Sequence, residues 1–273
     1  MTLSARRSAR ALAALLALTL VAGCAGEDDA GATGGSRRAA ASGALAKPSG
    51  PPIVEPVSGG YRAAPMSAAG SIRGTLAGGD SSAAPPADAG ASTDRACNGA
   101  RPTDPSALDG AIVWLADART GRALPRTRRF VVTNEKCQLA PRITAAIAGG
   151  TLHVKSDDRT THRLTFTRVG SGETEATVTM VDDGSLVAND RLLAKPGLFE
   201  VRCETHPSTH AWIAAFDHPY FTQPDSRGAF ALDSVPPGTY RVQAWHERFG
   251  TANGSVTVAA GAPAAVSLTF GAR

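Results

Sequence analysis

The stretch Leu198-Phe-Glu-Val-Arg-Cys-Glu-Thr-His-Pro-Ser-Thr-His-Ala-Trp-Ile-Ala-Ala-Phe216 contains two short apolar runs, 198–201 and 212–216, on either side of a polar loop. Brief runs of this kind, separated by Gly, Asp or Asn, recur along the chain, and no segment has a long helical period. Such spacing of short strands is typical of an all-β sandwich or barrel. We expect further strands at Ala111–Leu115, Phe130–Val132, Ile143–Ile147, Leu152–Val154, Leu164–Phe166 and Ala176–Val181.

The polar loop carries a thiol and an imidazole three residues apart, Cys203 and His206, followed by a proline and then by Thr209. This pattern resembles the ligand loop of amicyanin-type cupredoxins, Cys-x-x-His-Pro-x-Met, except at its last residue. The segment 154–163 resembles the strand and turn that contain the first histidine ligand of that family, here His162. The resemblance implies a cupredoxin-like Greek-key β-sandwich and one copper ion held by His162, Cys203 and His206, with Thr209 at the weak axial position.

The donor set suits copper, because a thiolate is a soft ligand and imidazole binds both oxidation states of the metal. Thr209 has no thioether, so the site is three-coordinate or takes the threonine hydroxyl, water or His210 as a fourth ligand. An open fourth position makes zinc a possible alternative ion. The family pattern has Asn where this chain has Ser156 and Arg163, so we expect one hydrogen-bonded tie between the ligand loops to be missing.

Two further histidines, His218 and His246, fall on the apolar-facing registers of their strands. We expect both to be half-buried, with their ring nitrogens satisfied by hydrogen bonds. The alternative is a second metal site that joins them.

A second sandwich is indicated by Asp225–Trp245, which reads as a turn, a strand, a Pro-Pro-Gly turn and another strand. This segment resembles the carboxypeptidase-regulatory-like, or transthyretin-like, module. The opening strands of that module would be supplied by Gly70–Gly74 and Gly110–Leu115. One continuous, elaborated cupredoxin sandwich is the alternative. The expected division is 70–124 as N-terminal strands of the regulatory-like sandwich, 125–222 as an inserted cupredoxin-like domain and 223–273 as the regulatory-like segment.

The N-terminus has three arginines before the apolar run 11–21, which is too short to span a bilayer as a mature helix. Leu20–Cys24 resembles a bacterial lipobox, so we expect 1–23 to be a lipoprotein signal peptide and Cys24 to carry lipid. An ordinary signal peptide is the alternative. Residues 24–69 are rich in Ala, Gly, Ser and Pro and are expected to be a disordered tether. The mature protein would then be exported, anchored to a membrane through lipid and exposed to the periplasm or the cell exterior.

With Cys24 taken by lipid and Cys203 by metal, Cys97 and Cys137 remain as a pair in an oxidising compartment. We expect a disulfide between them, which would stabilise the fold by roughly 2–4 kcal/mol. Two free buried thiols are the alternative, because sequence does not show whether the two Cα atoms approach.

The precursor has a formal net charge of +4, but removal of 1–23 takes away three arginines and no acidic residue, leaving +1. No basic block interleaved with aromatic residues remains, so we expect no nucleic-acid partner.

The leading hypothesis is a copper protein that passes single electrons to and from a redox partner, whose identity the sequence does not give. Copper storage or delivery without electron transfer is the first alternative. The second is a binding or scaffold module without metal, in which Cys203 is an inert thiol and His162 and His206 are surface residues. No Gly-x-Ser-x-Gly or His-Glu-x-x-His motif is present, and we do not expect an enzyme.

Overall fold

The computed structural model describes residues 60–78, 97 and 108–271. The predicted signal peptide 1–23, the predicted lipidation site Cys24 and most of the predicted tether 24–69 lie outside these residues. Within the described residues strands predominate and no α-helix occurs, so the predicted all-β class is confirmed. No helix in this part of the chain is long and apolar enough to cross a membrane.

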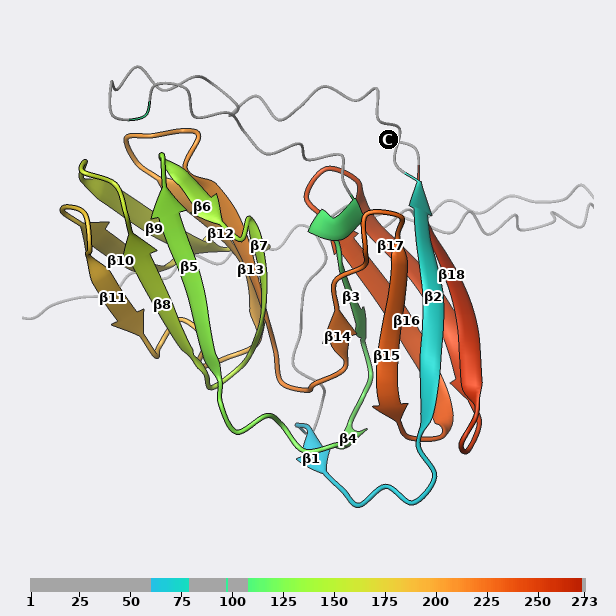
Figure 1. Cartoon of the computed structure of the whole chain (residues 1–273). Coiled ribbons are helices and arrows are strands. Elements are labelled where there is room, and N and C mark those ends of the chain that lie inside the picture. The colour runs from blue at the N-terminus through green and yellow to red at the C-terminus, as the bar shows by residue number, and fades with distance from the viewer. Residues whose placement is uncertain (1–59, 79–96, 98–107, 272–273) are drawn as a thin grey trace, which may run out of the picture. The chain divides into compact units, whose positions relative to one another are not determined.

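Strands from the middle of the chain form two sheets with a shared core (Figure 1). All neighbouring strands in these sheets are antiparallel except β13 (His210–Phe216) with β7 (Ile143–Ile147) and β5 (Arg129–Glu135) with β8 (Thr151–Ser156). The five-stranded sheet has the order β10 (Thr174–Met180), β9 (His162–Arg168), β12 (Gly197–Cys203), β13 (His210–Phe216) and β7 (Ile143–Ile147). The four-stranded sheet has the order β11 (Leu186–Asn189), β8 (Thr151–Ser156), β5 (Arg129–Glu135) and β6 (Gln138–Ala140).

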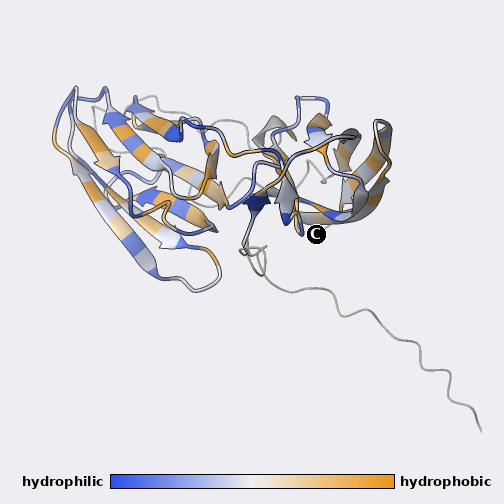
Figure 2. Cartoon of the chain, turned by 90° about the horizontal axis from the view of Figure 1, so that it is seen from below, coloured by the Kyte–Doolittle hydropathy of each residue, from blue (hydrophilic) through white to orange (hydrophobic). Residues whose placement is uncertain are grey.

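The core of this first sandwich follows from the alternation of side chains along each strand, which Figure 2 shows as alternating hydrophobic and hydrophilic residues. On β9, Leu164 and Phe166 are buried in this core, while the residue between them is only partly buried. On β12, Phe199, Val201 and Cys203 occupy the same register. Cys203 is therefore the last of the core-facing residues of β12, and apolar side chains of the core surround its thiol.

Strands from both ends of the described chain form a second pair of sheets. Strand β2 (Gly70–Gly78) pairs antiparallel with β15 (Ala229–Val235) and parallel with β18 (Pro263–Phe270). The other sheet has the order β14 (Phe221–Thr222), β3 (Ile112–Leu115), β16 (Gly238–His246) and β17 (Gly250–Val258).

One hydrophobic cluster joins these sheets and includes Ile72, Val113, Phe230, Leu232 and Val242. Strands that precede and strands that follow the middle segment therefore share one core. The domain boundaries at 125 and 222 stay a prediction.

A short strand lies within residues 24–69, the segment predicted to be a disordered tether. Arg62–Ala63 forms β1, which pairs in parallel with β4 (Thr120–Gly121). The hydroxyl of Tyr61 donates a hydrogen bond of 2.5 Å to the carbonyl oxygen of Arg122. Ordered structure thus begins before residue 70, because backbone pairing and one tyrosine compensate for the small side chains around them.

Strand β3 is buried on both faces, as the continuous apolar run Ala111–Leu115 predicts. Val113 and Leu115 belong to the core of the second sandwich. Ile112 and Trp114 belong to a separate cluster with residues of β7, β12, β13 and β16, namely Ile143, Leu198, Ala214, Phe216 and Trp245. This cluster joins strands of the first sandwich to strands of the second.

Candidate metal centre

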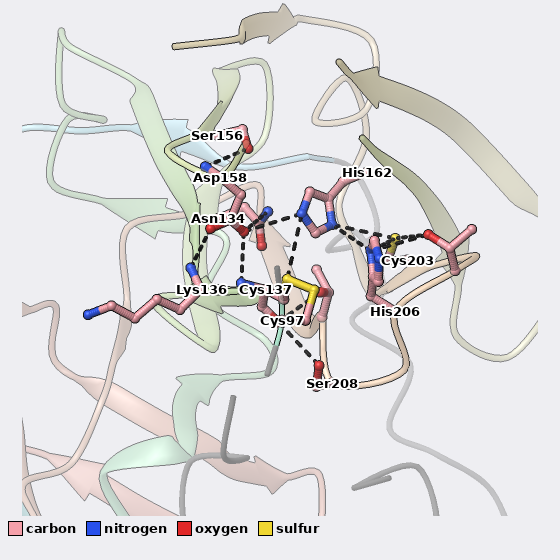
Figure 3. The surroundings of a disulfide bond; sticks show 12 residues. Cys97, Asn134, Lys136, Cys137, Ser156, Asp158, His162, Cys203, His206 and Ser208 are labelled. Atoms are coloured by element: carbon pink, nitrogen blue, oxygen red, sulfur yellow. Dashed lines mark hydrogen bonds and ion pairs between the residues drawn. A yellow bond between two sulfur atoms is a disulfide. The ribbon is translucent and has the colours of Figure 1, made fainter. Parts of the chain in front are cut away.

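Three potential ligands meet at one end of the first sandwich (Figure 3). His162 is the first residue of β9, Cys203 is the last residue of β12, and His206 lies in the loop that follows. The Sγ atom of Cys203 lies 3.7 Å from Nδ1 of His162 and 3.6 Å from Nδ1 of His206. The two Nδ1 atoms are 3.1 Å apart. The structure thus brings together the three residues that the sequence predicts as ligands.

Backbone pairing positions these side chains. Cys203 lies opposite Leu164 in the β12–β9 ladder, which places its thiol near the start of β9, where His162 stands. The loop after Cys203 turns back on itself, because the N–H of Cys203 donates to the carbonyl of Thr209 at 3.0 Å and the N–H of Thr209 donates to that of His206 at 2.9 Å. The loop is therefore a closed turn that returns directly into β13.

All three side chains are withdrawn from water: His162 is 0%, His206 4% and Cys203 7% exposed. Burial by itself raises the pKa of the Cys203 thiol, but hydrogen bonds with His162, with Thr205 and with the backbone outweigh burial and lower this pKa to about 5. The thiolate is therefore the favoured form of Cys203 near neutral pH, and the thiolate is the form that binds metal.

The separations between the donor atoms fit a single bound ion. Metal–nitrogen bonds of about 2.0 Å and metal–sulfur bonds of about 2.3 Å, the lengths known for zinc, hold nitrogen and sulfur about 3.7 Å apart in a trigonal plane. The distances of 3.6 and 3.7 Å agree with that geometry, while the 3.1 Å between the two Nδ1 atoms is shorter than the about 3.5 Å that the same bond lengths imply. A buried cysteine and two buried histidines, with their donor atoms facing one another, form a donor set that suits copper or zinc.

Thr209, the predicted axial residue, is fully buried and its hydroxyl donates a hydrogen bond of 2.7 Å to the carbonyl oxygen of Cys137. The proton of the hydroxyl is engaged by this bond, and the lone pairs of the oxygen remain. Its role as a weak axial ligand stays a prediction.

His210, the other predicted fourth ligand, does not join the cluster. Its Nε2 atom lies 3.1 Å from a carboxylate oxygen of Glu200, and its ring packs beside that of Trp212. Because β13 begins at His210, strand geometry separates this side chain from its neighbour Thr209.

The predicted disulfide between Cys97 and Cys137 is confirmed, with the two Cα atoms 5.3 Å apart. Cys203 is the free cysteine that remains among the described residues. Cys137 Sγ lies 4.0 Å from Nε2 of His162, so the disulfide is next to the metal ligands (Figure 3).

Sequence reasoning missed Asp158, whose Oδ2 atom lies 3.2 Å from Nε2 of His162. Cys137, Asp158 and His162 also form a group with metal-ligand spacing, but the sulfur of Cys137 is already bonded to Cys97. Asp158 therefore acts from behind the ligand cluster. No local sequence signal distinguishes it from the neighbouring Asp157, since its partners come from another strand.

The two departures from the family pattern have direct structural consequences. Ser156 accepts a hydrogen bond of 3.3 Å from the N–H of Asp158 through its hydroxyl. Arg163 accepts a backbone hydrogen bond of 3.0 Å from Glu204 and pairs with the carboxylate of Glu204 at 2.9 Å. The contacts between Arg163 and Glu204 join the two ligand loops, whereas the bond between Ser156 and Asp158 lies within one of them.

His218 and His246 are more deeply buried than the predicted half-burial, at 3% and 0% exposure. The N–H of Tyr220 donates to Nδ1 of His218 at 3.1 Å, and His246 stacks on Phe249 with its ring centroid 4.5 Å away. Aromatic neighbours complete their burial. Neither belongs to a group with metal-ligand spacing within the described residues.

One family model, described as polysaccharide lyase family 4, domain II, matches residues 206–266. This segment begins inside the ligand loop and extends into β18 of the second sandwich. The resemblance of 225–245 to a carboxypeptidase-regulatory-like module stays a prediction. No curated protein matches the chain.

Among solved structures, the chain is similar to amicyanin from Paracoccus versutus at 18% identity, covering 34% of this chain and 84% of that one with a TM-score of 0.28. A purple cupredoxin from Nitrosopumilus maritimus matches at 14% identity, covering 32% of this chain and 98% of that one with a TM-score of 0.27. Auracyanin from Roseiflexus castenholzii matches at 11% identity, covering 35% and 100% with a TM-score of 0.27. Since these scores are low, the metal centre is assigned from its own ligand geometry.

Proposed function

We propose that this protein binds one copper ion through His162, Cys203 and His206 and passes single electrons as a cupredoxin-type carrier. The observation that carries the proposal is the buried triangle of donor atoms, with edges of 3.1, 3.6 and 3.7 Å. The chemistry that copper supplies at such a site is the gain and loss of one electron with little rearrangement of the ligands.

The chain's own residues account for binding and rigidity. The Cys203 thiolate and two imidazole nitrogens supply the ligands. The closed turn 203–209 holds Cys203 and His206, and the β12–β9 ladder brings His162 to them. Leu164, Phe166 and Val201 lie in the same core as Cys203 and exclude water from that side of the thiolate. A site enclosed in this way limits both the movement of the ligands and the access of solvent.

The proposal includes export and attachment to a membrane through lipid on Cys24, with an unidentified redox protein as the partner and no enzymatic reaction of its own. The disulfide supports the export step, because such bonds persist in oxidising compartments.

Copper binding without electron transfer is the second candidate, and the position of Thr209 favours it. The hydroxyl of Thr209 donates to the carbonyl of Cys137, and this residue offers no thioether with which to tune the potential. Zinc is the competing ion for a site of this kind.

Titration of the purified protein with Cu²⁺ tests the proposal. The wild type should develop an intense visible thiolate-to-copper band that saturates at one equivalent, and Cys203→Ser should abolish it. His210→Gln is the matched control and should keep the band, since this histidine bonds to Glu200 outside the cluster.

The outcomes separate the candidates. Reversible reduction and reoxidation of the bound copper supports electron transfer. Binding without reversible reduction supports storage or delivery, and the absence of any band from the wild type would leave a binding or scaffold module. Addition of Zn²⁺ before Cu²⁺ measures how strongly zinc competes.

A further inference from the structure

The two ring nitrogens of His162 face different partners. Nδ1 lies in the donor triangle with Cys203 and His206, whereas Nε2 lies 3.2 Å from Oδ2 of Asp158. His162 is fully buried and Asp158 is 8% exposed, so water does not compete freely for this contact. A neutral imidazole has one N–H and one bare nitrogen, and the partner of one nitrogen determines the state of the other.

Asp158 is itself held in place by three donors. The backbone N–H groups of Lys136 and Cys137 donate to its two carboxylate oxygens at 2.6 and 2.7 Å, and the side-chain amide of Asn134 donates at 2.9 Å. Lys136 and Cys137 have positive φ values of 52° and 57°, an uncommon conformation for residues other than glycine. Two successive N–H groups in such a turn converge on one anion, and here that anion is the Asp158 carboxylate.

The same turn is also linked to the other ligand loop. The carbonyl oxygen of Cys137 accepts hydrogen bonds from the hydroxyls of Thr209 at 2.7 Å and Ser208 at 3.4 Å. The Cys97–Cys137 disulfide fixes this turn covalently. A single disulfide-bonded turn therefore contacts Asp158 behind His162 through its N–H groups and the loop of Cys203 and His206 through its carbonyl (Figure 3).

We propose that Asp158, held by the turn at Lys136 and Cys137, is a positioning residue that keeps the proton of His162 on Nε2 and the bare Nδ1 directed at the metal. This inference rests on the proposed copper site. A carboxylate that accepts the N–H of a ligand histidine orients the ring and makes the other nitrogen a stronger donor. A stronger donor favours Cu(II) over Cu(I), so Asp158 also lowers the reduction potential.

The first test uses the metal-free protein and no variant. The ¹⁵N NMR shifts of the His162 ring should show the proton on Nε2 in the wild type. A bare Nε2 would overturn the proposal whether or not the protein binds copper. If the tautomer is as expected but no copper band develops, the proposed function fails while the positioning role of Asp158 stands.

The second test compares Asp158→Asn with the wild type and two controls. Asp157→Asn removes an adjacent exposed carboxylate that pairs with Lys155, and Asp158→Glu keeps the charge. Asp158→Asn should bind Cu²⁺ roughly 10- to 100-fold more weakly in competition with a chelator. Its affinity for Cu(I) should fall less, so its reduction potential should rise.

Both controls should remain closer to the wild type than Asp158→Asn does, in Cu²⁺ affinity and in reduction potential. An Asp158→Asn protein that is folded by circular dichroism, yet matches Asp157→Asn in both quantities, would overturn the proposal. If Asp158→Asn does not fold, the NMR measurement on the wild type still shows whether Nε2 of His162 carries the proton that the proposal requires.

Discussion

His218 is the described histidine whose ionisation has the clearest consequence for folding. It is 3% exposed and lies among the rings of Tyr61, Phe216 and Tyr220. Loss of hydration on burial lowers its pKa from 6.5 to about 4, although backbone hydrogen bonds partly oppose this. The folded protein therefore keeps this ring neutral over a pH range in which an unfolded chain protonates it.

The lowered pKa predicts a loss of stability in weak acid. Between about pH 6.5 and 4 the unfolded state binds the extra proton, so the free energy of unfolding falls as the pH falls, by about 3 kcal/mol in total. Denaturant unfolding of the metal-free protein at several pH values measures this. His218→Gln should lose that part of the pH dependence, and an unchanged profile in the variant would contradict the prediction.

At the residue scale, the ligand loop was predicted from its resemblance to a cupredoxin ligand loop, because Cys203, His206 and Pro207 lie close together in the sequence. His162 followed from a family resemblance, and the structure brings it to the other two. Asp158 was not predictable, because its contacts depend on a turn more than twenty residues away. The hydrogen bond from Thr209 to the carbonyl of Cys137 was hidden for the same reason.

Among the strands, the pairing of β2 with β15 depends on a close approach of a ring to the backbone. Phe230 lies directly opposite Gly74, and a Cβ atom built on this glycine would lie 2.1 Å from the ring. The phenyl ring therefore covers the glycine and fills the position that a side chain would take. This contact explains why a glycine is needed at position 74, the end of the stretch Gly70-Ser-Ile-Arg-Gly74.

We expect Gly74→Ala to destabilise the protein by about 1–3 kcal/mol through overpacking. Gly271→Ala is the control, since nothing lies within 4 Å of a Cβ atom at that position. Combining Gly74→Ala with Phe230→Leu should cost less than the sum of the two single changes, because the smaller side chain makes room. Chemical unfolding of all four variants measures this, and a Gly74→Ala protein as stable as Gly271→Ala would contradict it.

The existence of most strands was predictable from their apolar runs, but their partners were not. The run 111–115 indicated a buried strand, and β3 is buried on both faces. One face of β3 meets Trp245 and Phe216, and the other meets Val242. These partners depend on which sheets come together, and no local sequence pattern encodes that. The tether prediction erred at Arg62–Ala63 because backbone pairing needs no large side chains.

For the whole described chain, side chains from both sandwiches make polar as well as apolar contacts. Arg142, just before β7, pairs with Glu247, which follows β16, at 2.6 Å, and the indole N–H of Trp212 donates to the same carboxylate at 2.7 Å. Glu247 has a side chain only 4% exposed, and these partners offset the hydration that its carboxylate loses on burial. The strand cluster around Trp114 and Trp245 adds apolar contact between the same strands.

The central claim is that one copper ion binds to Cys203, His162 and His206, and X-ray absorption at the copper edge tests it most directly. Protein loaded with one equivalent of Cu²⁺ should show one sulfur and two imidazole nitrogens as the nearest neighbours of copper. The sulfur contribution should vanish in Cys203→Ser. A spectrum of the wild type with only nitrogen and oxygen neighbours would place copper elsewhere and contradict the account.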